Sequence, residues 1–272
     1  MDVMSAFLLG AVQGLTEFFP ISSSGHLVLS QNTLGFKEPE VFFDICLHIG
    51  SLIAIFSVFW KDIMGFALGG MRLPLALFQR ERRLAMEERA FLFVFLGSIP
   101  TALIGFLAKD FLESMFASIP AVSINLLITG TFLWFTRYSS PRNPKNIGRM
   151  HWTDAVVIGC AQGLAIAPGI SRSGATISCG LFLGMERDLA VRFSFLLVIP
   201  ALLGAFVLEG RHADFTHMEF LPVFVGAGTA ALTGYITLKV LLRTVRKGSI
   251  FVFAPYCWLL GAVGLAVSFL HR

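Results

Sequence analysis

Two stretches rich in glycine, proline and serine recur in this chain, and they constrain its fold more than any other feature. The first is Gln13–His26, QGLTEFFPISSSGH, and the second is Gln162–Thr176, QGLAIAPGISRSGAT. With the second stretch shifted by 149 residues, seven positions carry the same residue, and Pro20 and Pro168 fall within one place of each other. An internal repeat of this kind predicts a chain built from two related units.

Composition places both copies inside a membrane protein. Hydrophobic residues make up 56% of the 272 residues, charged residues make up 14%, and the mean hydropathy is +0.77. Soluble domains are much more polar. The formal net charge is +4, but the basic residues lie in short tracts between apolar runs, so they indicate membrane topology and no nucleic-acid partner. The four cysteines lack metal-binding spacing, and neither a zinc site nor a disulfide framework is expected.

Six apolar segments have the length of about 20 residues that a membrane-spanning helix needs. They are residues 41–60, 90–108, 119–136, 189–208, 220–242 and 251–270. Two further apolar regions, 3–30 and 153–185, contain only short runs, because prolines and polar clusters interrupt them. Short, broken segments at corresponding places in two halves predict re-entrant helical hairpins that meet near the middle of the membrane.

The predicted fold class is therefore an all-α polytopic membrane protein with two inverted-topology repeats. Residues 1–136 form the first repeat and residues 152–272 the second, and a polar cytoplasmic connector at 137–151 joins them. Each repeat contains one re-entrant hairpin and three transmembrane helices. Because three is an odd number, the second repeat enters the membrane upside down relative to the first, and the two hairpin tips meet.

Basic residues give an independent prediction of the orientation. The loops at 61–89, 137–150 and 243–247 are rich in lysine and arginine, whereas the opposite loops carry few such residues. By the positive-inside rule the basic loops are cytoplasmic, which places both termini and the entrance of the first hairpin outside. The three basic loops contain Lys61, Arg72, Arg80, Arg82, Arg83, Arg89, Arg137, Arg142, Lys145, Arg149, Arg243, Arg246 and Lys247. The loops on the other side of the membrane contain Lys37, Lys109 and Arg211.

The hairpin tips predict an anion-binding site. The prolines are followed by Ser22–Gly25 and by Ser171–Gly174, and serine caps the N-terminus of a following helix. Two helix N-termini that face each other offer free N–H groups and positive dipole ends, and Arg172 adds a guanidinium that suits a phosphate. An arginine inside the membrane costs about 2.5–3.5 kcal/mol, so it needs a partner or a function.

The first copy of the repeat adds groups that suit catalysis. Glu17 lies four residues after Gln13 on the same helix face, and His26 lies three residues after Ser23. We expect these side chains and Arg172 to converge on one phosphoryl group. In such a site Arg172 holds the phosphate oxygens, a serine hydroxyl attacks, His26 moves the proton, and Glu17 holds a divalent cation or assists as a base.

Structural roles stay open for several of these residues. The serines at 22–24 could be simple helix caps, His26 could be structural, and Arg172 could pair with Glu17 as a structural ion pair. Thr176 could be a hydroxyl ligand or a threonine that faces its own helix. Other polar residues in apolar segments have structural interpretations too: we expect backbone hydrogen bonds for Gln13 and Gln162, and a role at the mouth of the site or in the structure for Asp44 and His48.

The two motifs resemble those of a known enzyme family. QGLTEFFPISSSGHL (13–27) and PGISRSGAT (168–176) are similar to the signature motifs of the bacterial undecaprenyl-diphosphate phosphatases, membrane enzymes associated with bacitracin resistance. The similarity covers essentially the whole chain, including LGF (34–36) and FSFLL (193–197). It implies hydrolysis of a polyprenyl diphosphate to the monophosphate and inorganic phosphate at the outer side of the bacterial plasma (inner) membrane, which recycles the lipid carrier for cell-wall synthesis.

The resemblance also implies roles for individual residues. Glu17 matches the essential acidic position, Ser23 the proposed nucleophile, His26 the motif histidine, and Arg172 the arginine that binds diphosphate. The remaining candidate phosphate-binding residues are Ser171, Ser173 and Thr176, which match the family's hydroxyl ligands, together with Ser22, Ser24 and Gln13. Whether Ser23 or His26 is the nucleophile stays open.

Gln13 bears on the cofactor. The family's first motif begins with Glu or Gln, and this chain has Gln13, so a mechanism with two carboxylates on a metal cannot apply unchanged. The resemblance implies dependence on Mg²⁺ or Ca²⁺, because oxygen-rich ligation without thiols suits hard cations, and Glu17 is the candidate metal ligand.

Two other functions compete with the phosphatase. A transporter or flippase of polyprenyl phosphate has the same architecture of inverted repeats with broken helices, and an anion channel is a third class. The set of Glu17, Ser23 and His26 favours chemistry, because transport of a phosphate requires no positioned nucleophile. The expected partners are the polyprenyl diphosphate substrate and membrane lipids, and the sequence leaves a homodimer open.

Overall fold

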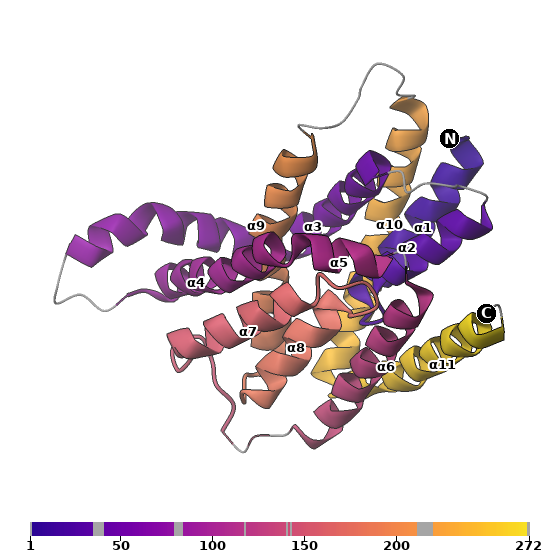
Figure 1. Ribbon diagram of the computed structural model, residues 1–272. Coiled ribbons are helices and arrows are strands. Elements are labelled where there is room, and N and C mark those ends of the chain that lie inside the picture. The colour runs from indigo at the N-terminus through magenta and orange to yellow at the C-terminus, as the bar shows by residue number, and fades with distance from the viewer. Residues whose placement is uncertain are drawn as a thin grey trace.

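The computed structural model describes residues 2–34, 41–78, 84–116, 118–139, 141, 143–210 and 220–270. Its elements, which Figure 1 shows, are α1 (Val3–Phe18), α2 (Ser23–Thr33), α3 (Val41–Phe78), α4 (Met86–Leu107), α5 (Lys109–Phe116), α6 (Ile119–Phe135), η1 (Thr136–Tyr138), α7 (Trp152–Leu164), α8 (Arg172–Phe182), α9 (Arg187–Gly210), α10 (Phe220–Arg246), η2 (Ile250–Phe253) and α11 (Ala254–Leu270). Of the residues used above, those outside the described ranges are Lys37, Arg80, Arg82, Arg83, Arg142, Arg211 and positions 35 and 36 of the LGF sequence.

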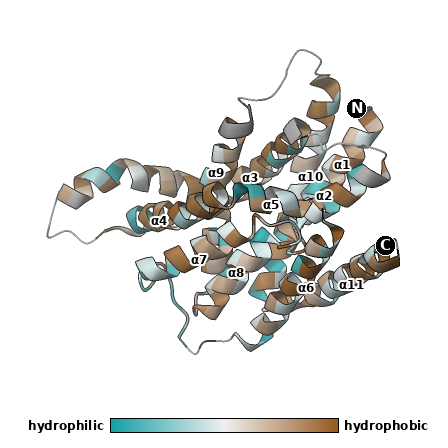
Figure 2. Cartoon of the chain, viewed as in Figure 1, coloured by the Kyte–Doolittle hydropathy of each residue, from teal (hydrophilic) through white to brown (hydrophobic). Residues whose placement is uncertain are grey.

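Six of these helices are long and apolar enough to cross a membrane, which confirms the prediction of an all-helical, polytopic membrane protein. They cover Phe43–Ala76, Met86–Leu107, Ile119–Tyr138, Arg187–Val207, Phe220–Arg246 and Ile250–Leu270. Large hydrophobic side chains such as Phe106, Phe224 and Leu270 are exposed on them, as expected for surfaces that face lipid. Figure 2 shows hydrophobic residues along the long helices and a hydrophilic segment between α6 and α7.

The first of these helices, α3, is longer than the sequence predicted. We interpreted residues 61–89 as a loop, but α3 continues through Lys61 to Phe78, so that interpretation is wrong for its first part. Residues 63–78 are again apolar, with Arg72 as the one charged residue, and a helix can therefore continue through them. The backbone is non-helical at Phe59 (φ −106°, ψ 22°), where α3 kinks.

Two pairs of shorter helices, α1–α2 and α7–α8, occupy the apolar regions that prolines interrupt. α1 and α7 contain 16 and 13 residues, and α2 and α8 contain 11 residues each. All four are shorter than the roughly 20 residues that a spanning helix needs. The chain turns between the helices at Pro20 and at Pro168-Gly169, and both Ser22 (φ 69°) and Gly169 (φ +91°) have a left-handed backbone, which serine adopts rarely.

Each short pair packs on a long helix from the other half of the chain. α1 lies against α10, and α7 lies against α4. A Cβ atom at Gly10 would lie 2.3 Å from the carbonyl oxygen of Gly226, and a Cβ atom at Gly159 would lie 2.0 Å from that of Gly97. The two contacts are equivalent in the sequence repeat. Gly10 aligns with Gly159 at the shift of 149 residues, and Gly97 and Gly226 occupy the same place in the similar segments FLGSIPTALIGF (95–106) and FVGAGTAALTGY (224–235). The two halves are therefore interlocked through matching glycine contacts.

A buried aromatic layer fixes the end of α1. The ring of Phe18 lies 5.6 Å from that of Phe195 on α9, and the ring of Phe195 lies 5.7 Å from that of Phe59 on α3. All three side chains are buried. Because Phe18 follows Glu17 directly, this packing holds the Glu17 turn of α1 against α3 and α9.

Candidate active site

The turns between the two short helix pairs lie in direct contact. The backbone N–H of Gly169 donates to the hydroxyl of Ser22 at 3.1 Å, and the hydroxyl of Ser173 donates to the carbonyl oxygen of Phe18 at 3.2 Å. All of these groups are buried. The repeated motifs are thus bonded to each other, and the residues that they carry share one site.

Helix α6 supports the second turn. Asn125 donates to the carbonyl oxygen of Pro168 at 2.8 Å, and Thr129 donates to that of Gly169 at 3.0 Å. The hydroxyl of Thr129 also accepts from the backbone N–H of Ser171 at 3.0 Å. These bonds satisfy buried backbone groups that a proline–glycine turn leaves without helical partners.

The two repeated glutamines do not hold the turns, contrary to our expectation. Gln162 donates to Thr101 of α4 at 3.3 Å and to the carbonyl oxygen of Leu197 of α9 at 3.2 Å. Gln13 donates to Glu17 at 3.1 Å and to the hydroxyl of Ser51 at 3.4 Å. Side chains of α6, and not the glutamines, bond to the backbone of the second turn. The amide of Gln13 instead orients the Glu17 carboxylate.

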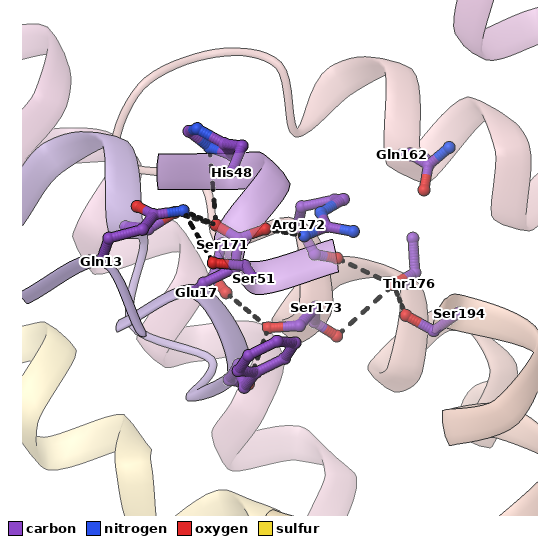
Figure 3. A network of polar contacts seen from close by, with 12 residues as sticks. Gln13, Glu17, His48, Ser51, Gln162, Ser171, Arg172, Ser173, Thr176 and Ser194 are labelled. Atoms are coloured by element: carbon purple, nitrogen blue, oxygen red, sulfur yellow. Dashed lines mark hydrogen bonds and ion pairs between the residues drawn. The ribbon is translucent and has the colours of Figure 1, made fainter. Parts of the chain in front are cut away.

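Glu17 is the centre of the site (Figure 3). It lies in the last turn of α1 and is 5% exposed. Its Oε1 atom forms an ion pair with Nη2 of Arg172, and its Oε2 atom accepts from the hydroxyl of Ser23 at 2.6 Å. Three of the four predicted catalytic residues, from α1, α2 and α8, therefore meet at one carboxylate.

Arg172 has hydrogen-bonding capacity to spare. It is the first residue of α8, behind the N-cap Ser171, whose hydroxyl accepts from the N–H of Gly174 at 3.1 Å. Its side chain is 17% exposed. The Nη1 atom is buried and has no hydrogen-bond partner in the described part of the chain. A buried guanidinium with unused donors is suited to an anionic ligand.

Both ring nitrogens of His26 bond to groups other than Glu17 and Ser23. Its Nδ1 atom lies 2.8 Å from the carbonyl oxygen of Ser22, and its Nε2 atom lies 2.7 Å from the hydroxyl of Tyr256 on α11. A nitrogen bonded to a carbonyl oxygen carries the proton, so Nε2 accepts from Tyr256. The two rings are stacked, with centroids 5.8 Å apart. Nothing in the sequence pointed to Tyr256, which lies 230 residues away.

Two residues of α3 complete the surroundings of Glu17. The Nε2 atom of His48 lies 3.6 Å from Glu17 Oε2, while its Nδ1 atom is held by the carbonyl oxygen of Asp44 at 2.8 Å. Ser51 accepts from Gln13. We had favoured a role at the mouth or in the structure for His48, but it lies beside the carboxylate. The spacing of 44, 48 and 51 places polar residues on one face of an apolar helix, a signal that could have identified them.

The other predicted phosphate-binding hydroxyls bond mainly to the protein itself. Ser24 lies 3.3 Å from Ser22, and Ser171 lies 3.3 Å from Ser173. Thr176 donates to the carbonyl oxygen of Arg172 at 2.8 Å and is 1% exposed. In this arrangement these side chains cap and join the turns around Glu17 and Arg172.

The site offers hard oxygen ligands but a single carboxylate. Oε1 of Gln13 is buried beside Glu17 and has no partner among the described residues. Within the same ranges no group of three or more His, Cys, Asp and Glu side chains is placed to hold a metal. The donors therefore fit Mg²⁺ or Ca²⁺ when substrate oxygens supply the rest of the coordination, and they do not fit an all-protein metal cage.

Comparison with known proteins identifies the family. A family model described as "Bacitracin resistance protein BacA" matches residues 6–263. The chain belongs to this family. The resemblance inferred from the two motifs is thereby confirmed, and in this BacA-family chain those motifs are the ones whose turns meet at Glu17.

Close relatives of this BacA-family chain share its full length. It is 42% identical over 275 residues to a protein of Desulforapulum autotrophicum named undecaprenyl-diphosphatase, covering 99% of each chain. It is 45% identical over 275 residues to one of the same name from Desulfosudis oleivorans, covering 98% of this chain and 99% of that protein. A third, from Desulfatibacillum aliphaticivorans, is 44% identical over 276 residues.

Proposed function

We propose that this protein hydrolyses undecaprenyl diphosphate to undecaprenyl phosphate and inorganic phosphate, which recycles the lipid carrier for cell-wall synthesis. The full-length relatives bear the name of this activity. The observation that carries the proposal is the hydrogen bond of 2.6 Å from Ser23 to Glu17, next to a buried arginine with unused donors. A hydroxyl bonded to a carboxylate beside a phosphate-binding cation is a nucleophile with its base.

The proposed first step transfers the terminal phosphoryl group to the protein. Arg172 binds the oxygens of that group, with the N-terminus of α8 aimed at the same charge. The oxygen of Ser23 bonds to the terminal phosphorus as its proton passes to Oε2 of Glu17. The bond from that phosphorus to the bridging oxygen breaks, and undecaprenyl phosphate leaves.

The proposed second step restores the protein. The oxygen of a water molecule bonds to the phosphorus of the phosphoserine as the bond from that phosphorus to the Ser23 oxygen breaks. Inorganic phosphate leaves with both protons of the water, and the serine oxygen recovers its proton from Glu17. Gln13 and His48 keep the carboxylate oriented through both steps. A divalent cation, when bound at the oxygens of Glu17 and Gln13, supplies charge neutralisation for the phosphate oxygens.

A membrane-facing groove offers a place for the polyprenyl chain. Its volume is about 500 Å³, and it is lined on α3 by Ile49, Leu52, Ile53, Phe56, Ser57 and Trp60. Ile49 and Leu52 directly follow His48 and Ser51, which lie at the site. The groove thus starts within one turn of α3 from the residues beside Glu17, and we propose that the apolar tail of a diphosphate bound at the site runs along it.

We further propose that the two halves are inverted repeats with re-entrant hairpins, and that the site opens to the outer side of the plasma membrane. The short helices and the equivalent glycine contacts support the inverted repeats, and the basic loops support the orientation. In a cysteine-free background, Asp110→Cys should react with an impermeant maleimide in intact cells. Lys247→Cys should react only after permeabilisation, and the reverse pattern would exclude the proposed orientation.

Phosphate release by the detergent-purified protein tests the activity. Arg172→Ala should nearly abolish release from undecaprenyl diphosphate, and Lys61→Ala, an exposed residue elsewhere on α3, should not change it. EDTA should stop release, and Mg²⁺ or Ca²⁺ should restore it. If no phosphate is released with any divalent cation, the proposed phosphatase activity is excluded.

Removal of the base or the nucleophile should lower the rate of chemistry. We expect Glu17→Gln and Ser23→Ala to reduce kcat by about 10²–10⁴-fold each. Because the two groups act in one step, the double variant should be little worse than either single variant. A trapped phosphoenzyme should survive acid, as phosphoserine does. An acid-labile phosphoenzyme would instead identify His26 as the nucleophile.

A further inference from the structure

A polar cavity, distinct from the apolar groove on α3, lies between α3, α9 and α10, which contact one another. Its volume is about 310 Å³, and its polar lining comprises Asp62, Arg192, Lys239, Arg243 and Arg246; we call it the basic cavity. Along α3, Asp62 lies eleven residues beyond Ser51, a rise of about 16 Å. The basic cavity is therefore separate from the Glu17 site.

The charges of the basic cavity are not balanced by the protein. Arg192 pairs with Asp62 at 2.8 Å, and Arg246 pairs with Asp188 at 2.8 Å. The guanidinium of Arg243 has no hydrogen bond or ion pair within the described ranges, and the ammonium of Lys239 bonds to the hydroxyl of Tyr235 and lies 4.2 Å from the centre of its ring. Two cations thus line the cavity without an acidic partner.

Lys239 and Arg243, the two cations without an acidic partner, lie four residues apart on α10, on one face of the helix. Like charges at this spacing destabilise a helix, and an anion held between them removes the repulsion. An ammonium and a guanidinium at one cavity can together bind the oxygens of a phosphate. Lys239 and Arg243 therefore favour an anion with several oxygens.

The surroundings favour a lipid over a free ion. Val58, Phe59 and Leu242 line the cavity beside its charges. Leu232, Ile236 and Val240 are exposed on α10, and their spacing of four places them on one face that leads to Lys239. A headgroup in the cavity would therefore continue into acyl chains lying along an apolar helix face.

We propose that the basic cavity binds the phosphate of an anionic phospholipid. Lys239 and Arg243 hold the phosphate oxygens, and the exposed apolar face of α10 contacts the acyl chains. Basic pockets between transmembrane helices are known to suit such headgroups, and each basic residue near the membrane surface adds to the attraction. This site is independent of the proposed phosphatase chemistry.

Native mass spectrometry of the full-length protein tests the proposal. The detergent-purified protein is titrated with phosphatidylglycerol and with phosphatidylcholine of the same acyl chains. We expect wild type to retain one phosphatidylglycerol in preference to phosphatidylcholine. The double variant Lys239→Gln/Arg243→Gln should bind phosphatidylglycerol about tenfold to thirtyfold more weakly, since it loses two cation–phosphate contacts. The matched control Lys61→Gln/Arg72→Gln removes the same charge from exposed positions of α3 and should bind like wild type.

Further measurements distinguish lipid binding at the basic cavity from binding at the Glu17 site and from binding of free phosphate. Arg172→Ala should keep phosphatidylglycerol binding, because it alters only the Glu17 site. Three results would each overturn the proposal. The first is loss of phosphatidylglycerol binding in Arg172→Ala, and the second is phosphatidylglycerol binding by the Lys239→Gln/Arg243→Gln variant as strong as that of wild type. The third is that wild type retains phosphatidylcholine as well as phosphatidylglycerol. Displacement of the lipid by millimolar inorganic phosphate would also overturn it and identify a free-phosphate site.

Discussion

At the scale of residues, the carboxylate of Glu17 divides its two oxygens between an ion pair with Arg172 and a set of polar neighbours. Charges buried without partners are strongly destabilising, so the pair keeps the site stable before substrate binds. In the proposed mechanism, a diphosphate that engages Arg172 replaces this partner and leaves Glu17 free to take the proton of Ser23. The structural ion pair and the catalytic role that the sequence left as alternatives are then two states of the same residues.

The sequence predicted part of this network for a physical reason. A repeat with two broken segments brings its two turns together, and Glu17, Ser23 and Arg172 lie beside those turns. Tyr256 could not be predicted, because its contact with His26 joins positions 230 residues apart and no local pattern encodes it. The orientation of His26 toward Tyr256, rather than toward Ser23, depends on that contact.

The coupling of His26 with Tyr256 is testable. If His26 acts through the orientation that Tyr256 gives it, Tyr256→Phe should lower phosphate release. The double variant His26→Ala/Tyr256→Phe should then be no slower than His26→Ala, because the tyrosine acts only through the histidine. Steady-state kinetics of the three variants measure this coupling. Additive losses would show that the two side chains act separately.

At the scale of elements, apolar length predicted the six long helices well, since a span needs a fixed thickness of hydrophobic residues. The prediction was wrong for residues 61–78, which we assigned to a basic loop although Lys61, Asp62 and Arg72 are their only charged residues. The contacts between helices were not predictable in the same way. Small residues allow close approach, but the sequence does not say which helix approaches them.

The contact of Gly10 with Gly226 gives a prediction for helix packing. A methyl group at Gly10 would lie 2.3 Å from a backbone oxygen, so Gly10→Ala must move α1 away from α10. We expect a loss of about 1–3 kcal/mol in the free energy of unfolding, as for other overpacked positions. Thermal unfolding of the detergent-purified protein measures this loss of stability.

Gly228→Ala is the matched control for that experiment. Gly228 lies on α10 two residues from Gly226, and a Cβ atom there would meet nothing within 4 Å. This variant should be neutral or more stable by up to about 1 kcal/mol, because alanine favours a helix over glycine. Equal destabilisation by the two variants would argue against close packing of α1 on α10.

At the scale of the whole molecule, the halves are interdependent because each one supplies the long helix on which the other's short helix packs. Glu17 and Ser23 come from one half, and Arg172 and its supporting turn come from the other. α6 crosses the same boundary through Asn125 and Thr129. The polar connector joins two parts that share one site and one core.

Separate expression of the halves tests this interdependence. A chain cut at Pro141 should release phosphate when both fragments are made in the same membrane. Neither fragment should do so alone, because each lacks either Glu17 or Arg172. An uncut chain made in parallel sets the reference rate. Activity in a single fragment would exclude a site shared between the halves.

The interlocking of α1 with α10 also sets an order of events during biosynthesis. The ribosome makes Gly10 at the start of the chain and Gly226 near its end, and at roughly 5–20 residues per second about 10–40 s separate them. Arg172 is made 54 residues before Gly226, so α1 waits longer for its packing partner α10 than Glu17 waits for its ion-pair partner. The packing of α1 on α10 is therefore among the last contacts to become possible, and only a nearly finished chain can become a mature enzyme.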